Sequence, residues 1–438
     1  MNLKRLAFVA VTLLVLSLVV PFFVPMGAYL PQVERTVSDK VGVPVTMKSL
    51  HVAILPSPRV TIKGIVMGRD AEIRVEEVSA VLDVRTLLDP VKVISRLEVK
   101  RPVVKKSALE LIGHLAQAEN KPNEAAPVAI RRIVLHDARL DWPGMNLPTL
   151  DGEIGMLAGN KLGQAKFTSA DGKLKVDVLP SNEGFDIALG AEQWMPPVGP
   201  ALLFDSLKVR AKLEGSHLDI PSIDARLYEG TVDGSASLDW TKLWKFSGKV
   251  KVAGMEVGKP ARLFSKTVRV SGKMTGNGTF VASAAKPDEM LDNAVADFKF
   301  DVAHGVLHGM DLAKAASLFI KQGQSGGETE FDELSGVLHA AGRQYDLRDL
   351  KVASGLLAAS GRMKVSPAKR LEGQVDVELK KGLALVTVPL QISGTVDAPV
   401  VMPTKAAVAG AAAGTAVLGP LGTGLGMKAG SALDRWFG

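Results

Sequence analysis

The chain has 438 residues, a formal net charge of +7, no cysteine and 5% aromatic residues. The lack of cysteine excludes disulfides, thiolate metal sites and cysteine nucleophiles. Charges of both signs alternate along the chain, and no run of Lys and Arg is interleaved with aromatic residues. We interpret these charges as a solvated face, and nucleic-acid binding is not supported.

Residues 1–5 carry Lys4 and Arg5, and an uncharged apolar run extends from Leu6 to Val24. This run has about the length of a membrane-spanning helix, and the two cations before it predict a cytoplasmic N-terminus. We therefore expect an uncleaved single-pass anchor at 6–24, with the chain beyond it exported. The alternative is a cleaved signal peptide, although the run is longer than an ordinary signal-peptide core.

An N-terminal β segment is predicted at 30–119. A short helix is expected at 31–40, followed by strands and proline-containing turns up to residue 99. Apolar residues then recur at helical spacing over 107–119, which predicts an amphipathic helix. This helix would pack against the sheet, cap its end or lie on a membrane surface. Residues 120–127 read NKPNEAAP and are predicted to be a linker.

A central repetitive β segment is predicted at 128–330, because apolar and polar residues alternate with a period of two. The phrase IDARLYEGTVDGSASLDW at 223–240 predicts a hairpin that turns around Gly230 and Gly234. A helical interruption is expected at 310–321. The positions assigned to the inward, apolar face are Val176, Val178, Ile187, Leu189, Val209, Leu213, Val250, Val252, Val268, Val270, Phe298 and Phe300.

A C-terminal β segment is predicted at 331–403. Its inward positions are Leu338, Val375, Val377, Val386, Val388, Leu390 and Ile392. Pro389 lies inside the clearest strand and predicts an edge strand or a bulge there. Gly361 is expected at the boundary between two strands, and Gly394 and Pro399 in a turn.

The tail, 404–438, contains an uncharged run of mostly Ala and Gly from Ala406 to Met427. Three interpretations remain open: a flexible tail, a small-residue hairpin packed on a partner, or a segment that inserts into a membrane. Trp436 and Phe437 would suit an interfacial anchor. No catalytic pattern is found, and His304 and His308 are poor metal-ligand candidates because no consistent acidic ligands accompany them.

The order of these motifs resembles the C-terminal end of the AsmA-like family, envelope proteins of Gram-negative bacteria. LRDLKVASGLLAASGRMKV is followed by VPLQISGTVDAPVVMP, and LYEGTVDG, VGVPV and LPSP lie upstream. The resemblance implies an inner-membrane protein whose bulk lies in the periplasm. It also implies a bridge-type carrier of phospholipid between the inner and outer membranes.

The expected fold is mainly β: an N-terminal transmembrane helix and then a long, curled, antiparallel-rich β-groove with a few short helices. Roughly 25 strands of 10–14 residues would make a ribbon on the order of 120 Å long. Its apolar lining would suit phospholipid acyl chains, and the tail is a candidate contact with the outer membrane or an envelope protein. We expect no enzyme activity and no cofactor or metal. In the alternative, the sheet closes into compact β domains that act as a scaffold in outer-membrane protein or lipopolysaccharide biogenesis.

Overall fold

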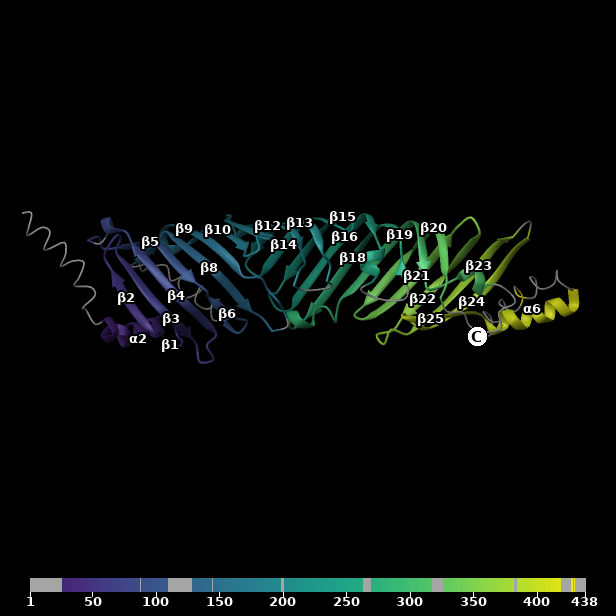
Figure 1. The fold of residues 1–438 in the computed structure, drawn as a ribbon, viewed down its shortest axis with the longest axis horizontal. Coiled ribbons are helices and arrows are strands. Elements are labelled where there is room, and N and C mark those ends of the chain that lie inside the picture. The colour runs from purple at the N-terminus through teal and green to yellow at the C-terminus, as the bar shows by residue number, and fades with distance from the viewer. Residues whose placement is uncertain are drawn as a thin grey trace, which may run out of the picture. The chain divides into compact units, whose positions relative to one another are not determined.

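The structure is a computed structural model that describes residues 26–86, 88–108, 128–143, 145–197, 201–262, 269–316, 326–381 and 384–418, with Met427 and Ala429. The described chain is mainly β and divides into two compact units, Met1–Ala191 and Glu192–Gly438 (Figure 1). The predicted anchor at 6–24, the linker at 120–127 and residues 109–119 of the predicted amphipathic helix lie outside the described residues. Among the helices that the structure describes, none has both the length and the apolar composition needed to cross a membrane.

The first unit begins with one helical segment and continues as a sheet. The helical segment comprises η1 (Met26–Tyr29) and α2 (Leu30–Val41), which confirms the helix expected at 31–40. Its other short helices are η2 (Val84–Thr86) and η3 (Ala158–Asn160). Its strands are β1 (Val45–Thr46), β2 (Ser49–Ala53), β3 (Arg59–Met67), β4 (Ile73–Leu82), β5 (Lys92–Lys100), β6 (Val103–Lys105), β7 (Val128–Ile130), β8 (Arg132–Asp141), β9 (Leu150–Met156), β10 (Leu162–Ser169), β11 (Leu174–Pro180) and β12 (Phe185–Trp194), the last up to Ala191.

Parallel pairing holds the two halves of this sheet together. β5 pairs with β7 and β8 in parallel, and β6 also pairs with β8 in parallel. Parallel neighbours need a connection of a dozen or more residues, which the chain from 106 to 127 provides. Residues 128–191 therefore belong with the N-terminal strands, and the division at Ala191 falls inside the segment predicted at 128–330.

Helix α2 covers the β1 part of the first unit's free edge. The backbone N–H of Val45 donates to Ser38 Oγ at 2.9 Å, and that of Met47 donates to Glu34 Oε1 at 2.6 Å. The apolar side of α2 packs on a small buried cluster that includes Val45 and Ile65. The helix thus satisfies N–H groups that an edge strand would otherwise leave open.

The second unit is an almost entirely antiparallel succession of strands with three described helices. The helices are α4 (Gly258–Ala261), α5 (Leu312–Ala315) and α6 (Lys405–Leu418), with the short η4 (Pro287–Glu289). The strands are β13 (Phe204–Glu214), β14 (His217–Leu227), β15 (Gly230–Asp239), β16 (Trp244–Glu256), β17 (Arg269–Val270), β18 (Lys273–Ala284), β19 (Val295–His308), β20 (Glu328–Ala341), β21 (Gln344–Ala353), β22 (Leu357–Val365), β23 (Leu371–Lys381), β24 (Ala384–Thr395) and β25 (Ala398–Pro403). Described strands range from 2 to 14 residues, so several are shorter than expected.

Pro389 lies in an interior strand, which corrects the expectation of an edge strand or bulge. β24 pairs with both β23 and β25, and Pro389 faces Asp376 in regular register. Proline is tolerated because β25 ends at Pro403, so no β25 residue faces Pro389. There the chain leaves the sheet for α6, and Thr404 N donates to the Pro389 carbonyl at 3.0 Å.

Strand β25 is an edge strand with few free donors. Because Thr404 N points at β24, the alternate positions Pro399, Val401 and Pro403 point away from it. Two of these three positions are prolines, which have no N–H. Val401 therefore supplies the one strand N–H that β25 directs to its outer side.

The glycines expected in turns have other roles. The hairpin before β15 turns at Tyr228 and Glu229, which both have positive φ, while Gly230 starts the strand and Gly234 lies within it. Gly361 also lies inside a strand, where a side chain would collide with the backbone of the neighbouring strand. Gly394 and Pro399 face each other beside the β24–β25 turn, close to their expected place.

Candidate apolar binding face

One uninterrupted row of apolar side chains and glycines crosses the sheet of the second unit. Residues paired directly across neighbouring strands project from the same face, so consecutive pairs trace a row over that face. We call it the inner row of the second unit. It runs Val209, Ile223, Gly234, Val250, Gly278, Phe298, Leu338, Leu347, Met363, Gly373, Ile392 and Val401.

The opposite face of the same strands is polar. Its matching row, one residue along each strand, is Ser235, Lys249, Thr279, Asp297, His339, Asp346, Lys364 and Glu372. Neighbours in this row also contact each other through polar atoms, since His339 Nδ1 lies 2.8 Å from Asp297 Oδ1. The sheet is therefore apolar on one side and charged on the other, as the period of two predicts.

The first unit carries two such rows of its own. One runs Leu50, Ile62, Val78, Val99, Leu135, Gly152, Phe167, Val176 and Leu189. The other runs Val52, Val60, Ala80, Leu97, Ile133, Ile154, Ala165, Val178 and Ile187. Most of these side chains are half-buried, and no charged residue interrupts either row.

The inner row changes from half-buried to buried along the second unit. Every member from Val209 to Gly373 is half-buried, whereas Ile392 and Val401 are only 5% and 2% exposed. The half-buried residues are therefore neither covered by protein nor fully exposed to solvent. The row is thus open over most strands and covered at the last two.

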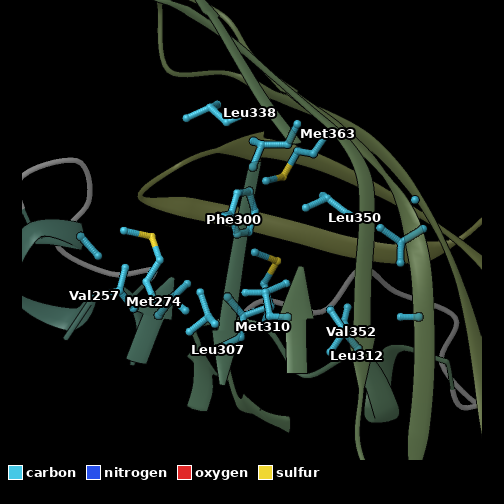
Figure 2. A pocket seen from close by; sticks show the side chains of 18 of the residues that line it. Val257, Met274, Phe300, Leu307, Met310, Leu312, Leu338, Leu350, Val352 and Met363 are labelled. Atoms are coloured by element: carbon cyan, nitrogen blue, oxygen red, sulfur yellow. The ribbon is translucent and has the colours of Figure 1, made fainter. Parts of the chain in front are cut away.

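A cavity of about 450 Å³ lies on this face, between β16 and β24. Among the described residues that line it, all but Ser360 have apolar side chains or are glycine. Figure 2 shows strand residues such as Phe300, Leu350 and Met363 facing Met310 and Leu312 across this space. The volume lies within the range of about 300–1,000 Å³ typical of small-ligand pockets.

Helix α5 and the chain before it build one wall of the cavity. Thr329, 4% exposed, accepts a hydrogen bond from Leu312 N at 3.0 Å and donates one to the Met310 carbonyl at 2.9 Å. Asp311 caps the helix by accepting from Lys314 N at 2.8 Å. These bonds fix Met310 and Leu312, which both line the cavity.

The first turn of α6 and Met427 cover the far end of the face. Ala407 is 0% and Met427 1% exposed, and both join the buried cluster that contains Val377, Val388 and Leu390. Residues 405–418 form a helix, which excludes a flexible coil for this part of the tail. Whether the tail contacts a membrane or partner stays a prediction.

The predicted lining positions have different surroundings. Val176, Leu189, Val178 and Ile187 lie in the rows of the first unit, and Val209, Val250, Phe298, Leu338 and Ile392 lie in the inner row. Phe300, Val270 and Val375 line the cavity with Phe298, Leu338 and Ile392. Val252 faces Gly276, and Leu213 faces Leu218. Val377, Val388 and Leu390 are buried in protein. Val268 and the side chain of Val386 lie outside the described residues.

Several cavity residues were not among the predicted positions, notably Met255, Met274, Leu334 and Leu350 from strands. Alternation with Thr275 marks Met274 as inward, so period two could have identified it. Met310 and Leu312 come from a turn and a helix of four residues, and strand periodicity carries no signal for them.

Several ionisable groups of the second unit have defined surroundings. Within the described ranges, no cluster of three or more potential metal ligands occurs. His308 Nδ1 contacts Glu328 Oε1 at 2.7 Å, and His304 has a positive φ of 47°. Burial raises the pKa of Asp301 above its ordinary value, and the nearby charge of Glu333 adds to this effect. Asp301 pairs with Thr275 and Ser335, away from the inner row.

Comparison with known proteins finds no matching family, no matching curated protein and no matching solved structure.

Proposed function

We propose that this chain carries phospholipid along an apolar β-groove, by holding the acyl chains against its inner rows. The observation that supports the proposal is the continuity of the inner row: from Val209 to Gly373 it contains no charge and remains half-buried. Burying each CH₂ of an acyl chain contributes about 0.8 kcal/mol. Since neighbouring positions along the row are chemically alike, an acyl chain would move between them without a large barrier.

The proposal includes a curled sheet and a cellular location. A sheet with one apolar face lowers its free energy by curving around that face or around a ligand. The predicted anchor at 6–24 and the resemblance to AsmA-like envelope proteins favour an inner-membrane protein whose strands lie in the periplasm. Phospholipid would then move towards the outer membrane. No step in this function requires a catalytic residue.

Photo-crosslinking tests this function directly. A photoreactive amino acid would replace Val250, Leu338 or Met363 on the inner row, in cells whose phospholipid is radiolabelled. The matched controls, Lys249 and Lys364, are neighbouring residues on the polar face. We expect lipid adducts at the three inward positions and none at the controls. Val377 and Val388 are fully buried, so they should crosslink to protein instead.

A charge on the row gives a second test. In Leu338→Asp, a carboxylate would stand among half-buried apolar side chains, where leaving water is costly. Lipid adducts at Val250 should then fall. The control Val337→Asp places the same charge beside Lys299 on the polar face, where it should have little effect.

The alternative function is a non-enzymatic scaffold for outer-membrane protein or lipopolysaccharide biogenesis. The packed C-terminal cluster around Leu390 favours it, because that part of the apolar face is already filled by protein. Protein adducts at all three inward positions, without lipid, would support the scaffold and exclude the carrier.

A further inference from the structure

Phenylalanines on the inner face stand opposite glycines in neighbouring strands. In the second unit Phe298 pairs with Gly278, and Phe300 pairs with both Gly276 and Gly336. In the first unit Phe167 pairs with Gly152. Further pairs of the same kind are Phe280 with Gly248 and Phe331 with Gly305.

At each of these glycines except Gly276, the paired ring lies close to the position that a Cβ would take. At Gly276 that place is occupied by the ring of Phe298 and not by its pair partner Phe300. A Cβ built on Gly152 would lie 2.8 Å from Cδ1 and 2.9 Å from Cε1 of Phe167. On Gly336 it would lie 2.9 Å from Cδ2 of Leu350, and 3.2 Å from both the Arg348 carbonyl oxygen and Cζ of Phe300. The rings therefore lie down over the neighbouring strand instead of standing into the space above the sheet.

This arrangement solves a packing problem that a binding face creates. Large aromatic side chains supply apolar area, but upright rings would block the row that they line. Glycine has no Cβ to hold the ring away from the neighbouring strand. The ring therefore lies close to the backbone, and the face stays apolar and shallow. Such glycine–phenylalanine pairs occur in both units, on either side of the division at Ala191.

We propose that these glycine–phenylalanine pairs set the clearance of the apolar face and make it selective for thin, unbranched hydrocarbon chains. This inference rests on the proposed carrier function and names its preferred substrate: phospholipid with linear acyl chains. A methyl branch on the acyl chain needs extra space above the sheet. The phenylalanine ring cannot move down to provide it, because the ring already lies against the backbone of the neighbouring strand. At the cavity, where Met310 and Leu312 face these strands, one methyl group is worth a factor of about ten or more in selectivity.

Two kinds of variant change the clearance in opposite directions. Gly152→Ala displaces the ring of Phe167, and Gly336→Ala displaces Leu350 together with the ring of Phe300. Both variants should reduce capture of linear chains. Phe300→Leu replaces the ring with a smaller side chain and leaves more space above the sheet, so this variant should admit branched chains. Gly155→Ala is the matched control, since it lies in the same strand as Gly152 and its Cβ would meet only the Gln164 carbonyl at 3.6 Å.

The experiment uses the purified full-length protein and two photoreactive phospholipids with the same headgroup. One has a linear acyl chain and the other a methyl-branched chain of equal length. The wild type and Gly155→Ala should favour the linear probe about tenfold. Phe300→Leu should bring the ratio close to one, and Gly336→Ala should lower linear-probe capture about tenfold.

The outcomes separate this inference from the carrier function. Capture of both probes equally by the wild type, or a ratio unchanged in Phe300→Leu, would overturn the clearance proposal and leave the carrier standing. Capture of neither probe by the wild type would overturn both. Circular dichroism of each variant identifies misfolding, and should Gly336→Ala misfold, Phe300→Leu and Gly152→Ala still decide the question.

Discussion

Replacing Thr329 with Val tests whether one buried hydroxyl holds the wall of the cavity. The two side chains have nearly the same shape, and valine is at least as favourable in a strand. The substitution removes both hydrogen bonds, leaving Leu312 N and the Met310 carbonyl without their partner. A buried backbone group without a partner costs about 1–3 kcal/mol, so we expect about 2–6 kcal/mol of lost stability for the two groups.

Two measurements check this loss. Urea unfolding gives the change in free energy, with Thr279→Val, an exposed threonine of β18, as the control. Hydrogen exchange over residues 310–316 should accelerate selectively, because the two lost hydrogen bonds hold α5 and the residues before it. Thr329→Ser should restore most of the protection. An unchanged urea midpoint, or faster exchange spread evenly over the strands, would refute the argument that this hydroxyl fixes α5.

Three further predictions concern packing and charge. Leu390→Ala should lower the free energy of unfolding by about 2–5 kcal/mol because Leu390 is 0% exposed, while Gln391→Ala on the other face should stay within about 0.5 kcal/mol; equal urea midpoints would contradict the assigned faces. Gly361→Ala should destabilise by about 1–3 kcal/mol, because its Cβ would meet the backbone of β23, and a thermal melt that matched the wild type would count against this close approach. The hydrogen bond from Lys100 at 2.8 Å lowers the pKa of Glu77, so its stabilising effect is present above the unfolded-state pKa and disappears as pH falls through the folded-state pKa. The stability gap between wild type and Glu77→Gln should therefore close at low pH, and a gap independent of pH would exclude this origin.

Periodicity in the sequence predicted which face of a strand is apolar, because that property depends only on alternate residues. Val250 and Phe298 were assigned inward on this basis, and the pairing places both on the inner row. The helix at 31–40 was also predicted correctly. Its residues form one amphipathic segment, which is again a local property.

The errors arise where a residue's role depends on the neighbouring strand. Gly361 was expected at a strand boundary, yet it lies inside a strand. Another backbone approaches it closely there and leaves no room for a side chain. Pro389 was expected in an edge strand or a bulge, yet it lies in an interior strand. Proline is tolerated there because the neighbouring strand β25 ends before reaching it. In the same way, the parallel pairing of β5 and the wall formed by Met310 depend on contacts distant in sequence. A single sequence contains no direct signal for such contacts.

The two guarded strands described above limit how other proteins can bind. A segment that joins a sheet by adding a strand needs a line of free N–H and C=O groups at the edge. The N–H groups of Val45 in β1 and of Met47 just after it are already bonded to α2, and on β25 the prolines leave only that of Val401. At these two places the described strands offer little template for an added strand. A protein partner that binds there would therefore have to use side chains.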